Sequence, residues 1–327
     1  MTSNHPRQIW DSDRAVQVGP DRLGRGLVAC AVAMLGCVLL AGCSNRQPYV
    51  TPARLERGLV IVLPGIEGRS PLNEAICEGL AAGGVDYAIE TYDWTFPFFP
   101  LYNLRAERRN RRKAAELVAR ILRYRMAYPG CPVVLVGQSG GGAIAIWAAE
   151  EMPPGQQVDG LIVLAPSLSP SYMLDSALAG SQRGIVNFYS SRDWLFLRIG
   201  TTVTGTMDGQ HDVSAGSAGF DVPSGVRSGS YQKLHQIGWT SEMAEKGHSG
   251  MHLTSGAVGY VSSYVAPFVL GETWGSELVS RVLETAATRP AVATKPPVES
   301  RPTSLPSRIW RPKLPNLSDL WPLDLEP

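Results

Sequence analysis

Short apolar runs recur along the middle of the chain, and segments with helical spacing lie between them. Six of these runs have the length of strands: GLVIVL (58–63), DYAIETYDW (86–94), PVVLVG (132–137), GLIVLAP (160–166), IVNFYSS (185–191) and YQKLHQIGW (231–239). A continuous apolar run such as PVVLVG is typical of a strand buried on both faces of a parallel sheet. Strands that alternate with helices predict an α/β fold, with a mostly parallel sheet flanked by helices on both faces.

One predicted helix combines an apolar face with many positive charges. Its apolar residues share one face at helical spacing: Ala114, Leu117, Val118, Ile121 and Leu122. Basic residues surround that face: Arg105, Arg108, Arg109, Arg111, Arg112, Lys113, Arg120, Arg123 and Arg125. We expect a solvated charged face, and contact with anionic lipid headgroups is the alternative.

The N-terminus has the pattern of a secretion signal. Arginines at positions 7, 14, 22 and 25 precede an apolar stretch (27–40) that ends in Leu-Ala-Gly-Cys at Cys43. About fourteen apolar residues are too few to span a bilayer and suit a signal-peptide core. The ending resembles the bacterial lipoprotein signal, which implies cleavage before Cys43 and a lipid on that cysteine. A plain secretory signal and an uncleaved anchor are the alternatives.

These patterns divide the chain into four parts. We expect a lipoprotein signal peptide (1–42), a linker from the lipid anchor (43–56), a single α/β domain (57–286) and a disordered tail (287–327). The last part carries nine prolines from position 289 onward, which prevents regular helix or central strand. The lipid would attach the protein to a membrane of the bacterial cell envelope.

Composition and cysteine usage narrow the classes of function. The formal charge of +1, with 44% apolar and 18% charged residues, is that of an ordinary globular protein and excludes a nucleic-acid binder. Cys77 and Cys131 would remain in the mature domain, either as a disulfide or as separate thiols. The spacing of cysteines and histidines predicts neither a metal site nor a cofactor.

The stretch VLVGQSGGGAIAIWA (134–148) places a serine on a glycine-rich turn between an apolar strand and an apolar helix. Gly137, Ser139 and Gly141 match Gly-x-Ser-x-Gly, the turn that exposes a nucleophile at the end of a strand. A phosphate loop would need Gly-Lys-Ser/Thr, which is absent. The looser dinucleotide pattern is met from Gly140, but that fold requires an acidic residue about twenty positions later, at the end of the next strand, and GLIVLAPS offers none there.

With this turn inside such a sheet, the chain resembles the α/β-hydrolase superfamily over most of residues 57–270. The resemblance implies that Ser139 is a nucleophile and that an acid and then a histidine follow it along the chain. The acid belongs after a later strand, which favours Asp193 behind IVNFYSS. The glycine-rich insertion beyond it offers alternatives: Asp208, Asp212 and Asp221.

The histidine belongs in the loop before the last helix, which we expect to begin near Thr254 or Ser255. His252 and His248 both lie in that loop, and we favour His252 because it is nearer the helix. His235 falls within a predicted strand, which favours a structural role. The imidazole would accept the serine proton, and the carboxylate would fix its tautomer.

The resemblance also selects two backbone donors for a negatively charged oxygen. Gly140 follows the nucleophile, and Ile66 lies in the turn LPGIEG (63–68), which is similar to the family's His-Gly-x loop with Pro64 in place of the histidine. Glu67, the next residue, is either a structural anchor or a substrate contact. Gln138 stands where many lipases of the family have histidine.

The function implied is that of a lipid-anchored serine hydrolase that forms an acyl-enzyme from a small-molecule or lipid ester, without a cofactor. An acyltransferase on the same fold and a catalytically silent binding lipoprotein are the alternatives. The aromatic stretch 92–100 and the segment 167–174 are either walls of an acyl pocket or packed loops. We expect the long connection 195–230 to cover or wall the pocket.

Overall fold

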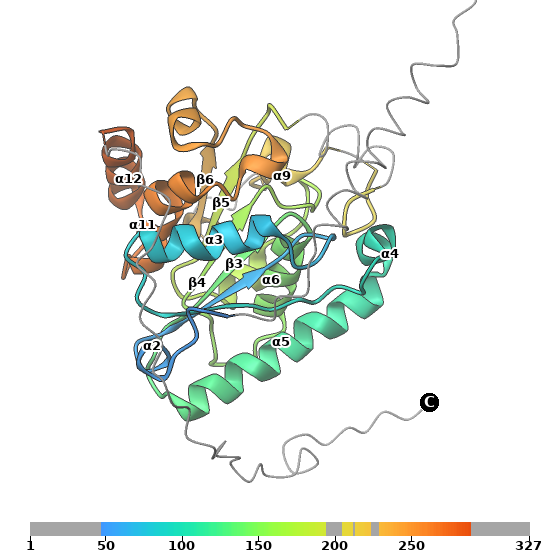
Figure 1. Cartoon of the computed structure of the whole chain (residues 1–327). Coiled ribbons are helices and arrows are strands. Elements are labelled where there is room, and N and C mark those ends of the chain that lie inside the picture. The colour runs from blue at the N-terminus through green and yellow to red at the C-terminus, as the bar shows by residue number, and fades with distance from the viewer. Residues whose placement is uncertain (1–46, 194–204, 212, 224–228, 289–327) are drawn as a thin grey trace, which may run out of the picture. The chain divides into compact units, whose positions relative to one another are not determined.

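The computed structural model describes residues 47–193, 205–211, 213–223 and 229–288 (Figure 1). Its centre is a six-stranded sheet in the order β2-β1-β3-β4-β5-β6, and every neighbouring pair is parallel. The strands are β1 (Leu59–Leu63), β2 (Ala88–Thr91), β3 (Val133–Gln138), β4 (Gly160–Leu164), β5 (Ile185–Tyr189) and β6 (Leu234–Gly238). Each strand coincides with one of the six predicted runs, with β3 extending one residue past its run, so the predicted α/β fold with a parallel sheet is confirmed.

Helices cover both faces of this sheet. The α-helices of the described part are α2 (Pro52–Leu55), α3 (Pro71–Ala82), α4 (Pro100–Arg105), α5 (Glu107–Ala127), α6 (Gly140–Glu150), α7 (Asp175–Ala179), α9 (Ala215–Ala218), α10 (Val258–Tyr260), α11 (Ala266–Leu270) and α12 (Ser276–Thr288). Single turns are η2 (Ser230–Lys233), η3 (Ser241–Lys246) and η4 (His252–Thr254), and η5 (Val261–Val265) is a π-helical turn between α10 and α11.

Alternate residues of each strand enter two separate cores. In β1, Leu59, Ile61 and Leu63 face the core formed with α5, α6 and α7, whereas Val60 and Val62 face the core formed with α3, α11 and α12. All five side chains are fully buried. Burial on both faces explains why the strands are continuous apolar runs rather than alternating ones.

The long helix α5 is amphipathic, as its spacing predicts. It buries Ala114, Leu117, Val118 and Ile121, and most of its basic residues lie on the partly or fully exposed side. Arg111 is more tightly held, with its guanidinium 4.7 Å from the centre of the Trp147 ring and 3.4 Å from Glu150.

Residues 47–56, the described part of the predicted linker (43–56), contact the domain. The carbonyl of Tyr49 accepts a hydrogen bond from the Ile89 amide (3.3 Å) at the β2 edge. Arg54 of α2 donates to the carbonyls of Val85 and Tyr87. A chain segment whose backbone completes a sheet edge becomes part of the domain, and composition alone does not reveal this.

The two ends of the chain fall outside the described residues. The predicted signal peptide and Cys43 lie there, as does the proline-rich segment beyond Thr288. Helix α12 runs to Thr288, slightly past the predicted domain boundary at 286. Within the described ranges, no helix combines the length and the apolar character needed to cross a bilayer.

Candidate active site

Ser139 lies on a strained turn between β3 and α6. Its φ of 53° and ψ of −120° are unusual for a residue with a side chain. The flanking glycines permit this turn, since a Cβ on Gly141 would stand 2.5 Å from the Pro64 carbonyl oxygen and one on Gly137 would stand 2.7 Å from Cα of Gly142. The Ser139 amide donates to Leu164 O (2.9 Å), which fixes the turn against β4.

His252 and Asp193 come together at the same end of the sheet. Asp193 follows β5, His252 opens η4, and His252 Nδ1 lies 2.7 Å from Asp193 Oδ2. Both residues are buried, Asp193 almost completely. Parallel strands end at one edge of a sheet, which explains why a residue after β5 reaches a loop close to the β3 turn.

The other candidates for the base and the acid that the sequence offered have different contacts. His248 Nδ1 contacts Thr254 Oγ1 (3.0 Å), and Asp208 accepts from the Ser169 amide (3.0 Å). Asp221 is exposed, and Asp212 lies outside the described residues. The last helix begins at Val258, a few residues later than expected, because η4 precedes it.

The charges around His252 favour its protonated form. Burial lowers the pKa of His252, but the carboxylates of Asp193 and Glu67 raise it, and the net direction is upward. His248 differs, because burial and the neighbouring His252 lower its pKa to about 4. His248 is therefore neutral near pH 7, whereas His252 titrates above the ordinary range of an imidazole.

The turn that holds Ile66 lies against Gly140, the residue after Ser139. The amide nitrogen of Ile66 lies 3.5 Å from where a Gly140 Cβ would stand, and neither the Ile66 nor the Gly140 amide makes a backbone hydrogen bond within the described part of the chain. Gly140 opens α6, where first-turn amides have no intrahelical acceptor. Such a pair of donors can stabilise an oxyanion.

Two residues that the sequence did not single out hold the turn of Pro64 and Ile66 in place. Trp94 is fully buried and donates from Nε1 to the carbonyl of Pro64 (2.8 Å). Asn103 is also buried and donates from Nδ2 to the carbonyl of Ile66 (2.9 Å). A tryptophan and an asparagine within an aromatic stretch carry no sequence pattern that identifies such a role.

Gln138 was also missed as a partner of the histidine. Its Nε2 lies 3.2 Å from His252 Nε2, and its Oε1 is buried without a hydrogen-bond partner among the described residues. The carboxylate of Glu67 lies beside that oxygen, since both border the position that a Gly65 Cβ would take. Burial raises the pKa of Glu67, and the charge of His252 opposes that shift.

The segment after β4 lies directly against the elbow. Ser167 donates its amide to the Ser139 carbonyl (3.1 Å), and the described part of the connection after Asp193 adds further bonds, from Met207 to Ser167 O (2.9 Å) and from Ala215 to Leu168 O (2.7 Å). The connection therefore borders one side of the elbow.

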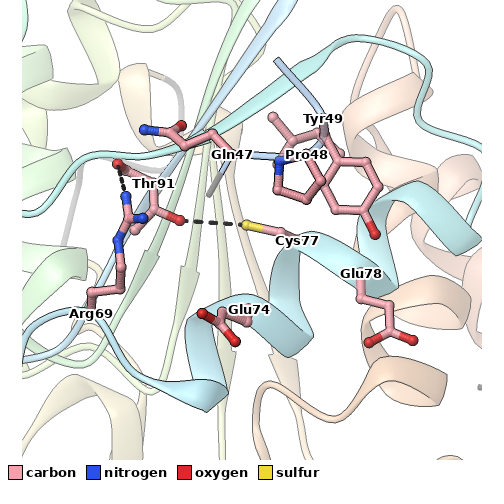
Figure 2. A pocket seen from close by; sticks show the side chains of 9 residues that line it. Gln47, Pro48, Tyr49, Arg69, Glu74, Cys77, Glu78 and Thr91 are labelled. Carbon is pink, nitrogen blue, oxygen red and sulfur yellow. Dashed lines mark hydrogen bonds between the residues drawn. The ribbon is translucent and has the colours of Figure 1, made fainter. Parts of the chain in front are cut away.

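A separate cavity of about 340 Å³ lies at the β2 edge (Figure 2). It is lined by Gln47, Pro48, Tyr49, Arg69, Glu74, Cys77, Glu78, Ile89 and Thr91, none of which is a predicted site residue. Cys77 Sγ lies 3.6 Å from Thr91 Oγ1, and burial raises the thiol's pKa to about 11. Cys77 and Cys131 are separate thiols.

Comparison with solved structures gives distant likenesses. Aspergillus fumigatus lipase B has a TM-score of 0.46 at 14% identity, over 72% of this chain and 57% of the lipase, so the chain spans little more than half of that protein. A cutinase-like protein from Cryptococcus sp. gives 0.38 at 15% identity, over 69% of this chain and all of that protein (100%). Esterase B from Lactobacillus rhamnosis gives 0.37 at 14%, over 81% and 93%. No protein-family model and no curated protein match the chain.

Proposed function

We propose that the protein is a serine hydrolase that cleaves carboxylic esters through an acyl-enzyme on Ser139. The observation that carries the proposal is the placement of His252, with Nδ1 bonded to Asp193 and Nε2 lying 3.2 Å from Nε2 of Gln138, the residue before Ser139. An imidazole held in this way presents its basic nitrogen to the nucleophile side of the site.

Each group has a defined part in the reaction. His252 Nε2 accepts the proton as Ser139 Oγ bonds to the ester carbonyl carbon, and the amides of Ile66 and Gly140 receive the oxyanion. The protonated imidazole then passes its proton to the departing alcohol as the C–O bond breaks. Water, deprotonated by the same nitrogen, releases the acid and restores the serine.

A fluorophosphonate probe tests the proposal directly. The parent chain is expected to be labelled, and Ser139→Ala is expected to lose all labelling. Ser167→Ala is the matched control, because Ser167 is also buried and lies next to the elbow. Equal labelling of the Ser139→Ala and Ser167→Ala variants, or none of the folded parent, would contradict the proposal.

We also propose that the mature chain begins at Cys43 and is anchored in the bacterial cell envelope by a lipid on that residue. The support is the apolar stretch (27–40) and the Leu-Ala-Gly-Cys ending. Gln47, four positions after Cys43, is already in the described domain. The anchor would therefore hold the domain close to the bilayer surface.

A further inference from the structure

The segment between β2 and α5 exposes a cluster of large apolar side chains. Phe96, Phe98, Phe99, Leu101 and Tyr102 are each about half exposed or more, and Phe98 reaches 76%. The rings form one group, with centroids 5.6 Å apart for Phe96 and Phe99 and 5.8 Å apart for Phe96 and Tyr102. Apolar groups gathered in this way differ from scattered surface residues and mark an interaction site.

Hydrogen bonds of two buried asparagines, Asn103 and Asn110, hold this cluster in its exposed position. Asn103 accepts from the Phe96 amide (2.7 Å) and donates to the Phe96 carbonyl (3.0 Å). The same side chain bonds Ile66 O, and Asn110 Nδ2 donates to the Asn103 carbonyl (2.5 Å). The fold therefore presents the rings at the rim of the candidate active site rather than burying them.

Positive charge follows the cluster immediately. Residues 105–113 contain six basic side chains and one acidic side chain, Glu107, and Arg105, Arg108 and Arg112 are exposed. Aromatic rings beside arginines suit the interface of an anionic bilayer, where the rings enter the headgroup region and the guanidinium groups meet phosphates.

We infer that residues 96–102, together with Arg105, Arg108 and Arg112, form a docking face for an anionic lipid bilayer. Because Asn103 joins this face to Ile66, docking would turn the mouth of the candidate site toward the membrane. The inference concerns lipid contact and does not depend on whether Ser139 reacts.

Tryptophan quenching by brominated lipids tests this face. Two variants of the full chain, Phe98→Trp and the control Met126→Trp, would be reconstituted in phosphatidylcholine vesicles with and without phosphatidylglycerol. Met126 suits the control because it is 70% exposed and lies at the far end of α5. We expect the added emission of Phe98→Trp to be quenched at least severalfold more than that of Met126→Trp, and only with phosphatidylglycerol present.

The second variant pair keeps the test decisive. Arg105→Ser combined with Arg108→Ser is expected to abolish the extra quenching of Phe98→Trp. Equal quenching at positions 98 and 126, or quenching that ignores the anionic lipid, overturns the inference. Light scattering in detergent could instead show a dimer that protects position 98. Without quenching in vesicles, that result would assign the face to a second copy of the chain and would also overturn the inference.

A second inference rests on the Gln138 amide. Its Oε1 and a Glu67 carboxylate oxygen both border the position that a Gly65 Cβ would take, and the amide oxygen has no hydrogen-bond partner in the described part of the chain. Two acceptors side by side repel, whereas a proton on Glu67 turns the contact into a hydrogen bond. The buried surroundings of Glu67 favour that proton.

We propose that Glu67 and Gln138 are positioning residues that hold the base nitrogen of His252 in a resting state. The Glu67 carboxyl group donates to Gln138 Oε1, Gln138 Nε2 donates to His252 Nε2, and His252 Nδ1 donates to Asp193. Ser139 must displace the Gln138 amide before its proton can move. When His252 is protonated instead, the amide turns over, its oxygen accepts from the imidazolium, and Glu67 is anionic.

Charged groups from several elements of the described chain face this pair. Three groups face His252: Asp193 from the loop after β5, His248 from the loop before η4 and Glu67 from the loop after β1. Asp93 faces Glu67 from the loop after β2. Removing the Glu67 carboxylate leaves Asp193 as the imidazolium's partner. The proton affinity of His252 should then fall by about tenfold.

Histidine NMR titration of the full chain measures the proton affinity of His252 without any substrate. The result is therefore independent of the proposed hydrolase activity. The His252 resonance is assigned by its loss in His252→Gln. We expect a lower His252 pKa in Glu67→Gln and an unchanged one in Glu74→Gln, which removes a carboxylate in α3 that is absent from the groups acting on His252. An unchanged pKa in Glu67→Gln overturns the second inference.

Discussion

His252 Nδ1 and Asp193 Oδ2 lie 2.7 Å apart although 59 positions separate these residues in the chain. The distance is that of a strong, charge-assisted hydrogen bond. It orders the imidazole so that the opposite nitrogen faces Gln138, the residue before Ser139. The consequences of this pair for activity and for pH dependence can be measured separately.

Replacing the carboxylate by an amide should leave the fold intact and disturb the imidazole tautomer. We expect Asp193→Asn to lower kcat/KM for a short-chain ester by about ten-thousandfold, as is typical when the acid of such a triad is lost. Asp208→Asn is the control, because Asp208 bonds Ser169 instead. Similar rates for both variants would remove Asp193 from the mechanism.

The two histidines of the loop before the last helix should behave differently. His252→Gln is expected to abolish reaction with a fluorophosphonate, because the serine loses its proton acceptor. His248→Gln should retain most of it, since His248 bonds Thr254 and is neutral near pH 7. Labelling rates compared at equal folded concentration decide between them, and the reverse pattern would make His248 the base.

The pH dependence follows from the charge of the base. The neutral imidazole accepts the proton, so kcat/KM is lost as the pH falls through the pKa of His252. Burial lowers this pKa, but Asp193 and Glu67 raise it by more, which places the acidic limb of the profile above the ordinary value of 6.5. A profile measured on a neutral ester checks this, and a limb well below 6.5 would contradict it.

The glycines of the elbow predict a large difference between two similar substitutions. Gly141→Ala would push a methyl group against the carbonyls of Leu63 and Pro64 and should lower the free energy of unfolding by about 1–3 kcal/mol. Gly275→Ala meets no atom within 4 Å and should change it little. Denaturant titration of both variants measures the difference, and equal midpoints would contradict the close packing at Gly141.

Lipid attachment can be tested independently of catalysis. A bacterium fed an alkyne fatty acid is expected to label the parent chain at Cys43, and Cys43→Ser should lose the label. Cys131→Ser is the control, because it removes a half-exposed thiol of the folded domain instead. Retention of the label in Cys43→Ser would contradict an anchor at this position.

The sequence predicted the sheet well because the central strands β1, β3 and β4 are buried on both faces and therefore read as short apolar runs. The elbow was visible for a similar reason, since the glycines around Ser139 meet a local steric demand. The proposed roles of Ser139, Asp193 and His252 came from the order of residues along the chain and remain predictions, although the structure brings His252 and Asp193 together.

Contacts between distant segments could not be predicted from the sequence. The bond of Trp94 to Pro64 and the bond of Asn103 to Ile66 depend on how the β2–α5 segment lies across the β1 turn. The proximity of Gln138 to His252 depends on a side-chain direction at the end of β3. The contacts of residues 47–56 with the domain depend on the bond of Tyr49 to Ile89 and on the bonds of Arg54 to Val85 and Tyr87, which their composition does not indicate.

Because the site is built from loops after β1, β3 and β5, it can form only when the sheet has formed. The amides of Ile66 and Gly140, the elbow and the Asp193–His252 pair come from segments that meet only after the strands have paired in the order β1-β3-β4-β5. Such long-range pairing is slow and cooperative. An unfolded chain therefore contains Ser139, Asp193 and His252 but does not bring them together. Under the proposed mechanism the serine stays unreactive until the sheet has formed.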